Sequence, residues 1–380
     1  MGTAAGDHLA AIAEAPRPAG GGAERAAREH CARALRAIGF VVETQDFVYS
    51  TFPGRWGTPI GGAFMIVMFL AAGHLGSQAN PRAAVVLLIA GALALGVFAR
   101  SMGGDAVLDF RHARARSTNL VATRGAPTLW LVAHLDSKSQ PVPIAARALG
   151  VMVSIAMWIA AAALAFVQLY VPVALGLWIA VTLLGVLASI PVALSIVGAR
   201  SPGALDDASG VVTVLRTAEL LARDKPLGVL LTSAEELGLA GARAWARESA
   251  SKARGLLGAL DSATKSRVGA TGSSTHLGVL NIDGVDDFGG LRLIYSGASP
   301  RALLGLLGVD WPAPTRFPPG VLMDGVALAD VGWEVLNISK GSWRTVSRIH
   351  TRGDDLAQLT GCGAEEVATL LAGAITASRR

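Results

Sequence analysis

Charged residues are scarce in this chain. They make up 16% of its 380 residues, whereas typical soluble domains contain about 25%. Hydrophobic residues reach 52%. The length suits one large domain or two ordinary ones, but a soluble domain would rarely be so apolar. The shortage of charge is also uneven along the chain, which indicates that the apolar excess is local.

Cysteine is scarce as well, and other common signals are missing. The two cysteines, Cys31 and Cys362, imply no disulfide framework and fit a reducing compartment. The first fifty residues contain no apolar run of the kind found in a signal peptide. No basic segment is interleaved with aromatic residues, so we expect no nucleic-acid partner.

Three stretches of the chain carry no Asp, Glu, Lys or Arg: 56–81, 83–99 and 148–199. A membrane-spanning helix needs about 20 apolar residues. We therefore predict two transmembrane hairpins, with helices near 59–77, 83–99, 148–168 and 173–197. Buried core helices are the alternative, but these usually carry some charge on an exposed edge. The chain is thus expected to contact a lipid bilayer.

Arginines predict which side of the membrane the polar part occupies. Arg82 alone lies on the far side of the hairpins, and the other flanking arginines lie on the polar side: Arg55, Arg100, Arg111, Arg114, Arg116, Arg147 and Arg200. Positive charge favours the cytoplasmic side. We expect a multi-pass protein of the cytoplasmic membrane whose polar domain faces the cytoplasm. A transporter is disfavoured because the hairpins contain almost no ionisable residue.

The rest of the chain is predicted to form one α/β domain with a mostly parallel central sheet. Strands are expected at 40–47, 118–122, 128–133, 227–232, 277–282, 291–295 and 334–338, and helices at 23–38, 211–223, 239–249 and 355–378. Alternation of strands and helices is typical of a three-layer fold. The predicted parts are 1–56, 101–146 and 200–380 for this domain, and 57–100 and 147–199 for the hairpins.

Polar motifs follow several predicted strands, at the sheet edge where sites form in such folds. His134 and Asp136 end the strand TLWLVA. An imidazole there can bind a metal, and Asp136 can accept its other N–H and set the tautomer. A surface histidine is the plain alternative. Asp206 and Asp207 begin a helix after a glycine turn, where a carboxylate can equally cap the helix.

Two adjacent glutamates, Glu235 and Glu236, follow the strand VLLTSA. A buried unpaired carboxylate is unfavourable, so the pair is either a solvated loop or part of a metal site. Asp283 ends another predicted strand, with Asp261 as a rival. His350 lies in RIHTRGDD and, taken alone, is an ordinary loop histidine.

Together these motifs form an ordered series of His, Asp, Glu-Glu, Asp and His. This is a ligand set suited to two zinc ions that share a carboxylate. The motifs HLD, GALDDASG, AEELGLAG, NID and IHTRGDD resemble metallopeptidase family 28, the co-catalytic zinc aminopeptidases, which also includes glutaminyl cyclases. The resemblance spans most of the polar chain and implies a zinc-aminopeptidase-like fold with two Zn²⁺ per chain.

The resemblance also implies a role for each residue. His134 and Asp283 would hold one zinc, Glu236 and His350 the other, and Asp206 would bridge them. Glu235 would be the general base, and Asp136 would support His134.

This assignment favours a membrane-anchored exopeptidase that hydrolyses peptide substrates. A single-zinc glutaminyl-cyclase-like acyltransferase and a non-catalytic membrane scaffold are the alternatives.

The sequence departs from the family in two respects. Met323-Asp324-Gly325 stands where the family often has Ser-Asp-His, which affects the expected substrate pocket and leaves the zinc ligands intact. The hairpins are absent from the usual soluble enzyme. One is inserted after Phe47, and the other lies between the His134 strand and the Asp206 turn.

Overall fold

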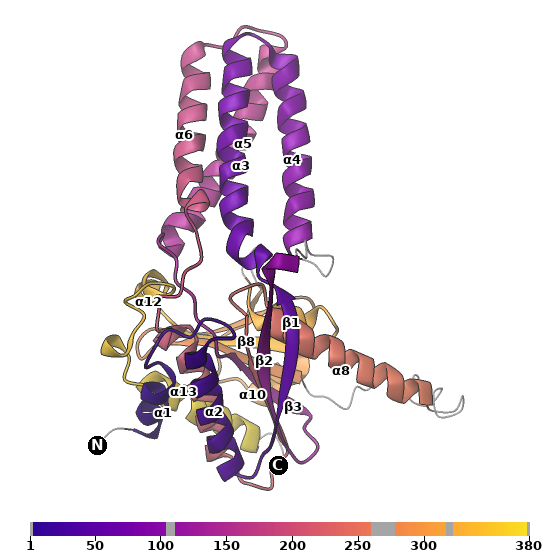
Figure 1. Ribbon diagram of the computed structural model, residues 1–380, viewed down its shortest axis with the longest axis vertical. Coiled ribbons are helices and arrows are strands. Elements are labelled where there is room, and N and C mark those ends of the chain that lie inside the picture. Colours follow the sequence, from indigo (N-terminus) through magenta and orange to yellow (C-terminus); the bar gives the residue numbers. More distant parts are fainter. Residues whose placement is uncertain (1–2, 104–110, 260–277, 317–321, 378–380) are drawn as a thin grey trace. The chain divides into compact units, whose positions relative to one another are not determined.

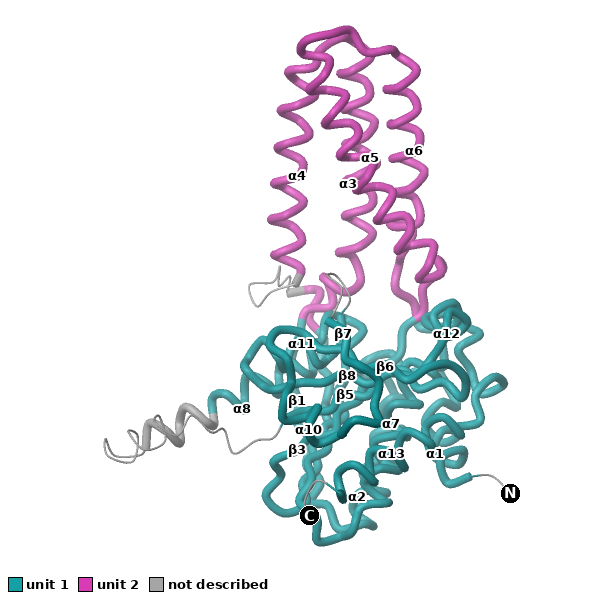
Figure 2. Tube along the Cα trace, turned by 180° about the vertical axis from the view of Figure 1, so that it is seen from behind, with its two compact units in different colours: residues 1–49, 115–138, 199–380 teal, residues 50–114, 139–198 magenta. Residues whose placement is uncertain are grey.

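The computed structural model describes residues 3–103, 111–259, 278–316 and 322–377. The chain forms two compact units that alternate along the sequence (Figure 2). Unit 1 contains residues 1–49, 115–138 and 199–380, and unit 2 contains residues 50–114 and 139–198.

Unit 1 is built on an eight-stranded sheet with the order β1-β2-β4-β3-β5-β8-β6-β7 (Figure 1). The strands are β1 (Val41–Ser50), β2 (Arg114–Arg124), β3 (Leu129–His134), β4 (Leu227–Thr232), β5 (Gly278–Val285), β6 (Gly290–Tyr295), β7 (Thr315–Arg316) and β8 (Val335–Gly341). The central strands β4, β3, β5 and β8 are mutually parallel, whereas β2 and β6 are antiparallel to their inner neighbours. The predicted α/β fold with a mostly parallel sheet is confirmed.

Both faces of the sheet are buried, which explains why the central strands β3 and β4 are nearly continuous apolar runs. In β3, Leu131 and Ala133 pack into one hydrophobic cluster, while Trp130 and Val132 pack into the other. The first cluster includes residues of α1 (Ala4–Ile12), α2 (Gly22–Ala37), α7 (Ser209–Leu220), α10 (Arg301–Leu307) and α13 (Cys362–Ala377). The second includes residues of α8 (Ala240–Ala259) and α11 (Asp324–Ala329).

The helices of unit 1 differ from the sequence prediction at several places: α8 runs to Ala259 instead of residue 249, and α10, α11 and α12 (Trp343–Arg348) were not predicted. The closing helix α13 begins at Cys362 instead of residue 355, because Gly361 adopts a φ of 86° that a helix cannot continue through. Helix α1 was not predicted. It is short, Thr3 caps its first turn by accepting a hydrogen bond from the Gly6 backbone N–H, and it buries Leu9 and Ile12 against the sheet layer.

The described part of unit 2 includes four helices that are long and apolar enough to cross a membrane. They are α3 (Phe52–Ser77), α4 (Pro81–Gly103), α5 (Ile144–Gln168) and α6 (Leu175–Ala193). The predicted turns lie where expected, between α3 and α4 and between α5 and α6. Helices α3 and α5 begin earlier than predicted, and α6 ends earlier, at Ala193.

Small residues allow the helices of unit 2 to pack closely. A Cβ atom at Gly62 would lie 2.3 Å from the backbone nitrogen of Ala193, and one at Gly73 would lie 2.1 Å from Oγ1 of Thr182. Close approach at glycine is typical of helix pairs in membranes. By contrast, α4 leaves Leu93 and Val97 about two-thirds exposed.

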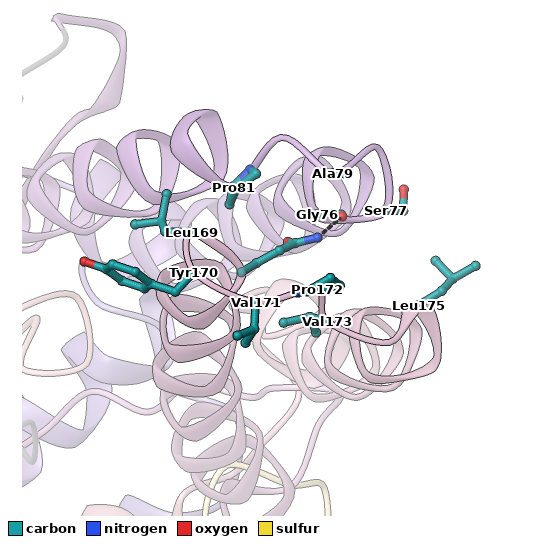
Figure 3. Close-up of a pocket in the computed structure, with 11 residues that line it drawn as sticks. Gly76, Ser77, Ala79, Pro81, Leu169, Tyr170, Val171, Pro172, Val173 and Leu175 are labelled. Atoms are coloured by element: carbon teal, nitrogen blue, oxygen red, sulfur yellow. Dashed lines mark hydrogen bonds between the residues drawn. The ribbon is translucent and has the colours of Figure 1, made fainter.

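A small pocket lies beside the two turns of unit 2 (Figure 3). Tyr170 and Pro172 are among its lining residues. Gln168 also lines it, donating a hydrogen bond to the carbonyl of Gly76 at 3.0 Å and accepting one from the indole of Trp178 at 3.0 Å. The bond to Gly76 links the two hairpins, and the bond to Trp178 links α5 to α6 within the second hairpin.

Candidate metal centre

The carboxyl ends of β4, β3 and β5 lie next to one another because these strands are parallel neighbours. His134 is the last residue of β3, and Glu235 and Glu236 follow β4. Asp283 lies within β5, two residues beyond Asn281, which pairs with Val132. Asp283 is therefore level with His134 across the sheet. The rival residue Asp261 lies outside the described residues.

Asp206 and Asp207 sit in a tight segment before α7, and their side chains have different tasks. Asp207 accepts hydrogen bonds from the backbone N–H groups of His134, Gly210 and Gly284 at 3.0–3.1 Å. It thus supplies the helix-capping function that the sequence left as an alternative, and it also braces two strands. Asp206 is free of these bonds, and its carboxylate faces the histidines.

The carboxylate of Asp206 stands between two imidazoles. Its Oδ1 is 3.1 Å from Nε2 of His134, and its Oδ2 is 3.0 Å from Nε2 of His350. His350 follows helix α12 (Trp343–Arg348) instead of a strand, and its φ of 65° turns the chain back toward the sheet. The two oxygens of one side chain therefore face two separate donors.

Donor atoms suitable for metal binding gather into two groups that share Asp206. The first contains His134, Asp206 and Asp283, and the second contains Asp206, Glu236 and His350. Within each group the ligand atoms lie within 4.8 Å of one another. All five residues predicted as metal ligands are thus brought together.

Glu235 is close to both groups but belongs to neither. Its Oε2 is 4.0 Å from Nε2 of His134. Burial raises the pKa of Glu235 well above its usual range, and the nearby carboxylates of Glu236, Asp324 and Asp283 raise it further. The charge of His134 opposes this shift, but the net shift of the Glu235 pKa is upward.

Asp136 makes hydrogen bonds both to the loop that carries Glu235 and Glu236 and to His134. Its two oxygens accept hydrogen bonds from the backbone N–H groups of Glu235 and Glu236, at 3.1 and 3.2 Å. The acceptor nearest to Nδ1 of His134 is the backbone carbonyl of Asp136 at 3.0 Å, while the Asp136 carboxylate lies 3.7 Å away. The carbonyl is therefore the closer of the two groups that can set the tautomer.

Sequence reasoning missed three residues beside this site. Nζ of Lys138 lies 2.5 Å from Oε2 of Glu236. Asp354 accepts hydrogen bonds from the backbone N–H groups of Leu205 and Asp206, at 2.6 and 3.2 Å. The third is Arg17, a fully buried arginine. Only HLDSK and RGDD carried any signal, because Lys138 and Asp354 stand within a few residues of predicted ligands.

The structure also shows why the histidine that is frequent in the family does not fit at position 325. Asp324 is buried, and Thr232 donates its hydroxyl to Oδ2. Next to it, a Cβ atom at Gly325 would lie 2.1 Å from Oδ1 of Asn337. A histidine cannot occupy position 325 unless Asn337 moves.

Carboxyl groups outnumber fixed cations at this site. Burial raises the pKa of Asp283 and of Asp354 to about 7. Burial lowers the pKa of His134 and His350, but the surrounding carboxylates outweigh it and the net shift is upward. A metal requires neutral imidazole and ionised carboxylate, so binding here would release protons.

Another buried carboxyl, that of Glu24, supports the loop that carries Glu235. Its Oε2 accepts a hydrogen bond from the Gly20 N–H at 2.6 Å, and its Oε1 accepts one from the hydroxyl of Ser233. Burial and then the charge of Asp136 raise the pKa of Glu24 from 4.5 to about 7.

We predict that Glu24 makes stability fall as pH rises. Between pH 4.5 and 7 the folded protein holds a proton on Glu24 that the unfolded chain has lost. Folding therefore takes up a proton, and the free energy of unfolding falls by up to about 3 kcal/mol as pH rises through this window. Glu24→Gln should remove that loss. The free energy of unfolding in detergent should match that of wild type at pH 4 and exceed it at pH 8.

Glu219→Gln provides a control of opposite sign. Burial raises the pKa of Glu219, but His8 and Arg216 outweigh it and lower the pKa overall. Its carboxylate stabilises the fold above the ordinary pKa, and this contribution is lost as pH falls. The control should therefore be destabilised most at pH 8. An unchanged pH dependence in Glu24→Gln would contradict the prediction.

Comparisons with known proteins relate part of this chain to one peptidase family. The sequence model of peptidase family M28 matches residues 189–375. The fold is similar to an aminopeptidase from Aneurinibacillus sp. strain AM-1, at 16% identity over 98% of this chain and 93% of that chain, with a TM-score of 0.52. No curated protein matches the chain in sequence.

Two further structures share the fold at a TM-score of 0.50. One is a glutaminyl cyclase from Fimbriiglobus ruber, at 13% identity over 98% of this chain and 93% of that chain. The other is a zinc aminopeptidase from Bacillus subtilis, at 14% identity over the same shares of the two chains. At these identities the likeness is one of fold.

Proposed function

We propose that this chain, whose residues 189–375 belong to peptidase family M28, is a membrane-anchored, zinc-dependent exopeptidase of the aminopeptidase type. It would hydrolyse peptide bonds with a water molecule activated by two zinc ions. The observation that carries the proposal is the placement of Asp206, whose two carboxylate oxygens face His134 and His350 separately.

The donor set suits zinc. Imidazole nitrogens and carboxylate oxygens are its usual ligands in catalytic sites. Oε1 of Glu236 is buried and lies 3.3 Å from Nε2 of His350, so two candidate ligand atoms of the second group face each other. His134, Asp206 and Asp283 would hold one ion, and Asp206, Glu236 and His350 the other.

Zinc in these positions would polarise the peptide carbonyl and make a water molecule acidic near neutral pH. The protein itself would move the protons. Glu235 would take a proton from the attacking water and deliver it to the nitrogen of the leaving amine as the C–N bond breaks. Asp136 would keep Glu235 in place through the backbone N–H that it binds.

Anchoring to the lipid bilayer is proposed from the four apolar helices of unit 2. The sequence inserts α5 and α6 between His134 and Asp206, so the two ends of this hairpin join segments that carry metal ligands. The excess of arginine on one side favours a cytoplasmic catalytic domain. Labelling of a cysteine at position 116 from outside the cell would contradict that orientation.

The first test is the zinc content of detergent-purified protein, measured by elemental mass spectrometry, together with hydrolysis of unmodified dipeptides and tripeptides. We expect two zinc ions per chain and release of the N-terminal amino acid, which a chelator abolishes and zinc restores. N-acetylated peptides should be cleaved far more slowly. No zinc after supplementation, or zinc without hydrolysis, would argue for a scaffold.

One observation favours a second candidate, a glutaminyl-cyclase-like acyl transfer with a single zinc. Lys138 pairs with Oε2 of Glu236, so its positive charge opposes a dication in the second group. Peptides that begin with glutamine separate the two functions. Hydrolysis would release free glutamine, whereas cyclisation would release ammonia and leave a peptide lighter by that mass.

A further inference from the structure

Arg17 is buried completely and makes its contacts with the backbone. Its guanidinium donates hydrogen bonds to the carbonyls of Leu135 at 2.7 Å, Gly203 at 2.9 Å, Ile12 at 3.1 Å and Pro202 at 2.5 Å. No carboxylate of the described residues is recorded in an ion pair with it. A buried charge that is satisfied by carbonyls alone is unusual, because removing a charge from water is unfavourable.

The carbonyls that Arg17 binds belong to the two segments that carry metal ligands. Leu135 directly follows His134 at the end of β3, and Gly203 stands three residues before Asp206. One planar guanidinium therefore ties the His134 strand to the Asp206 turn. Its fixed fork of donors sets both the distance and the direction between them.

The backbone of Arg17 strengthens the same junction. Its N–H donates to Oγ of Ser137 at 2.9 Å, and its carbonyl accepts from the Ser137 N–H at 2.8 Å. The hydroxyl of Ser137 in turn donates to the carbonyl of Ser201 at 2.9 Å. The strand end and the turn are thus joined twice, once through the guanidinium and once through Ser137.

Charge adds a second effect. Burial lowers the pKa of Arg17, while Asp354, Asp207 and Asp136 raise it through their charges. Each of these three carboxylates binds backbone N–H groups that hold a ligand or the general base. The guanidinium is therefore attracted to three carboxylates that hold the site in place.

We propose that Arg17 is a positioning residue of the metal centre, which holds His134 and Asp206 at the separation that the first zinc requires. The proposal deepens the function proposed above and rests on its metal site. It predicts that the shape of Arg17 matters as well as its charge, since a lysine ammonium cannot reach four carbonyls in one plane.

The test compares zinc affinity in Arg17→Lys with that in Arg124→Lys. Arg124 is a matched control because it is also buried and donates hydrogen bonds to two backbone carbonyls, those of Lys225 and Ile38. It pairs with Leu227 at the start of β4, which is the end of that strand away from the metal site. Zinc dissociation constants would be measured with a competing chromophoric chelator on metal-free, folded protein, well below its melting temperature.

We expect Arg17→Lys to bind zinc about 10 to 100 times more weakly than wild type, as is typical when the groups that orient ligands are changed. Activity should return when zinc is raised. Arg124→Lys should lose thermal stability and keep its zinc affinity within about twofold of wild type. Equal affinity in Arg17→Lys and wild type would overturn the proposal and leave Arg17 a purely structural role.

Ser137→Ala keeps the proposal testable if Arg17→Lys does not fold. It loosens the same junction more gently, because it removes the hydroxyl between Arg17 and Ser201. Zinc binding should weaken in the same direction by a smaller factor, and unchanged affinity would again count against the proposal. A wild type that binds no zinc would refute the proposed function instead, so the two failures are distinguishable.

Discussion

Asp206→Asn should abolish zinc at one position or both and reduce kcat/KM by about 10³-fold or more. One oxygen of the carboxylate lies beside His134, and the other lies beside His350. The amide has the same shape but only one oxygen, so it cannot serve two cations. Losing the activated water and the polarised carbonyl removes several kcal/mol of transition-state stabilisation. Zinc per chain and peptide hydrolysis would be measured on the same preparation.

Asp207→Asn is the matched control because Asp207 is the next residue and is also buried. Its carboxylate accepts three backbone N–H groups, and an amide nitrogen cannot replace an acceptor. We expect lower thermal stability with two zinc ions retained. If Asp206→Asn kept both ions and full activity, the shared-carboxylate arrangement would be wrong.

Glu235→Gln should keep zinc and lose kcat by about 10² to 10⁴-fold, the range expected when a general base is removed. Glu235 belongs to neither group of ligand atoms, and its backbone N–H to Asp136 is unaffected by the substitution. Only the capacity to take and return a proton disappears. The zinc content, kcat and KM of the variant would separate this loss from a loss of metal.

Glu236→Gln gives the contrasting pattern at the adjacent residue. It removes a ligand and leaves Lys138 without its carboxylate partner, so zinc content should fall together with activity. A Glu235→Gln variant that retained more than about a tenth of wild-type kcat would assign proton transfer to another group. Asp324 would then be the next residue to test, because it is buried nearby and its pKa is raised to about 6, chiefly by burial.

The proposed general base and the proposed metal ligands could be singled out from the sequence because each stands in a short local motif. Strands β3 and β4 are nearly continuous apolar runs, so their ends were recognisable: His134 is the last residue of β3, and Glu236 lies shortly after β4. His350 was harder to place because it follows a short helix. It was found only through the order of the motifs, since nothing local distinguishes it from other loop histidines.

The supporting residues could not be predicted for a physical reason. Arg17 acts through backbone carbonyls, which every residue possesses, so no pattern of side chains marks its partners. Glu24 precedes Ser233 by more than two hundred positions, and their hydrogen bond depends on how α2 packs on the sheet. Lys138 resembled an ordinary polar loop residue until Glu236 was placed beside it.

The sequence by itself determined the four apolar helices, the α/β alternation and the order of the ligands. These features depend on local composition and periodicity, because hydrophobic burial and backbone hydrogen bonding act over a few turns or strands. Only the tertiary structure decided that Asp206 would face both histidines while Asp207 braced the backbone. That choice depends on hydrogen bonds between β3, β5 and the turn before α7, which form only after distant segments have been brought together.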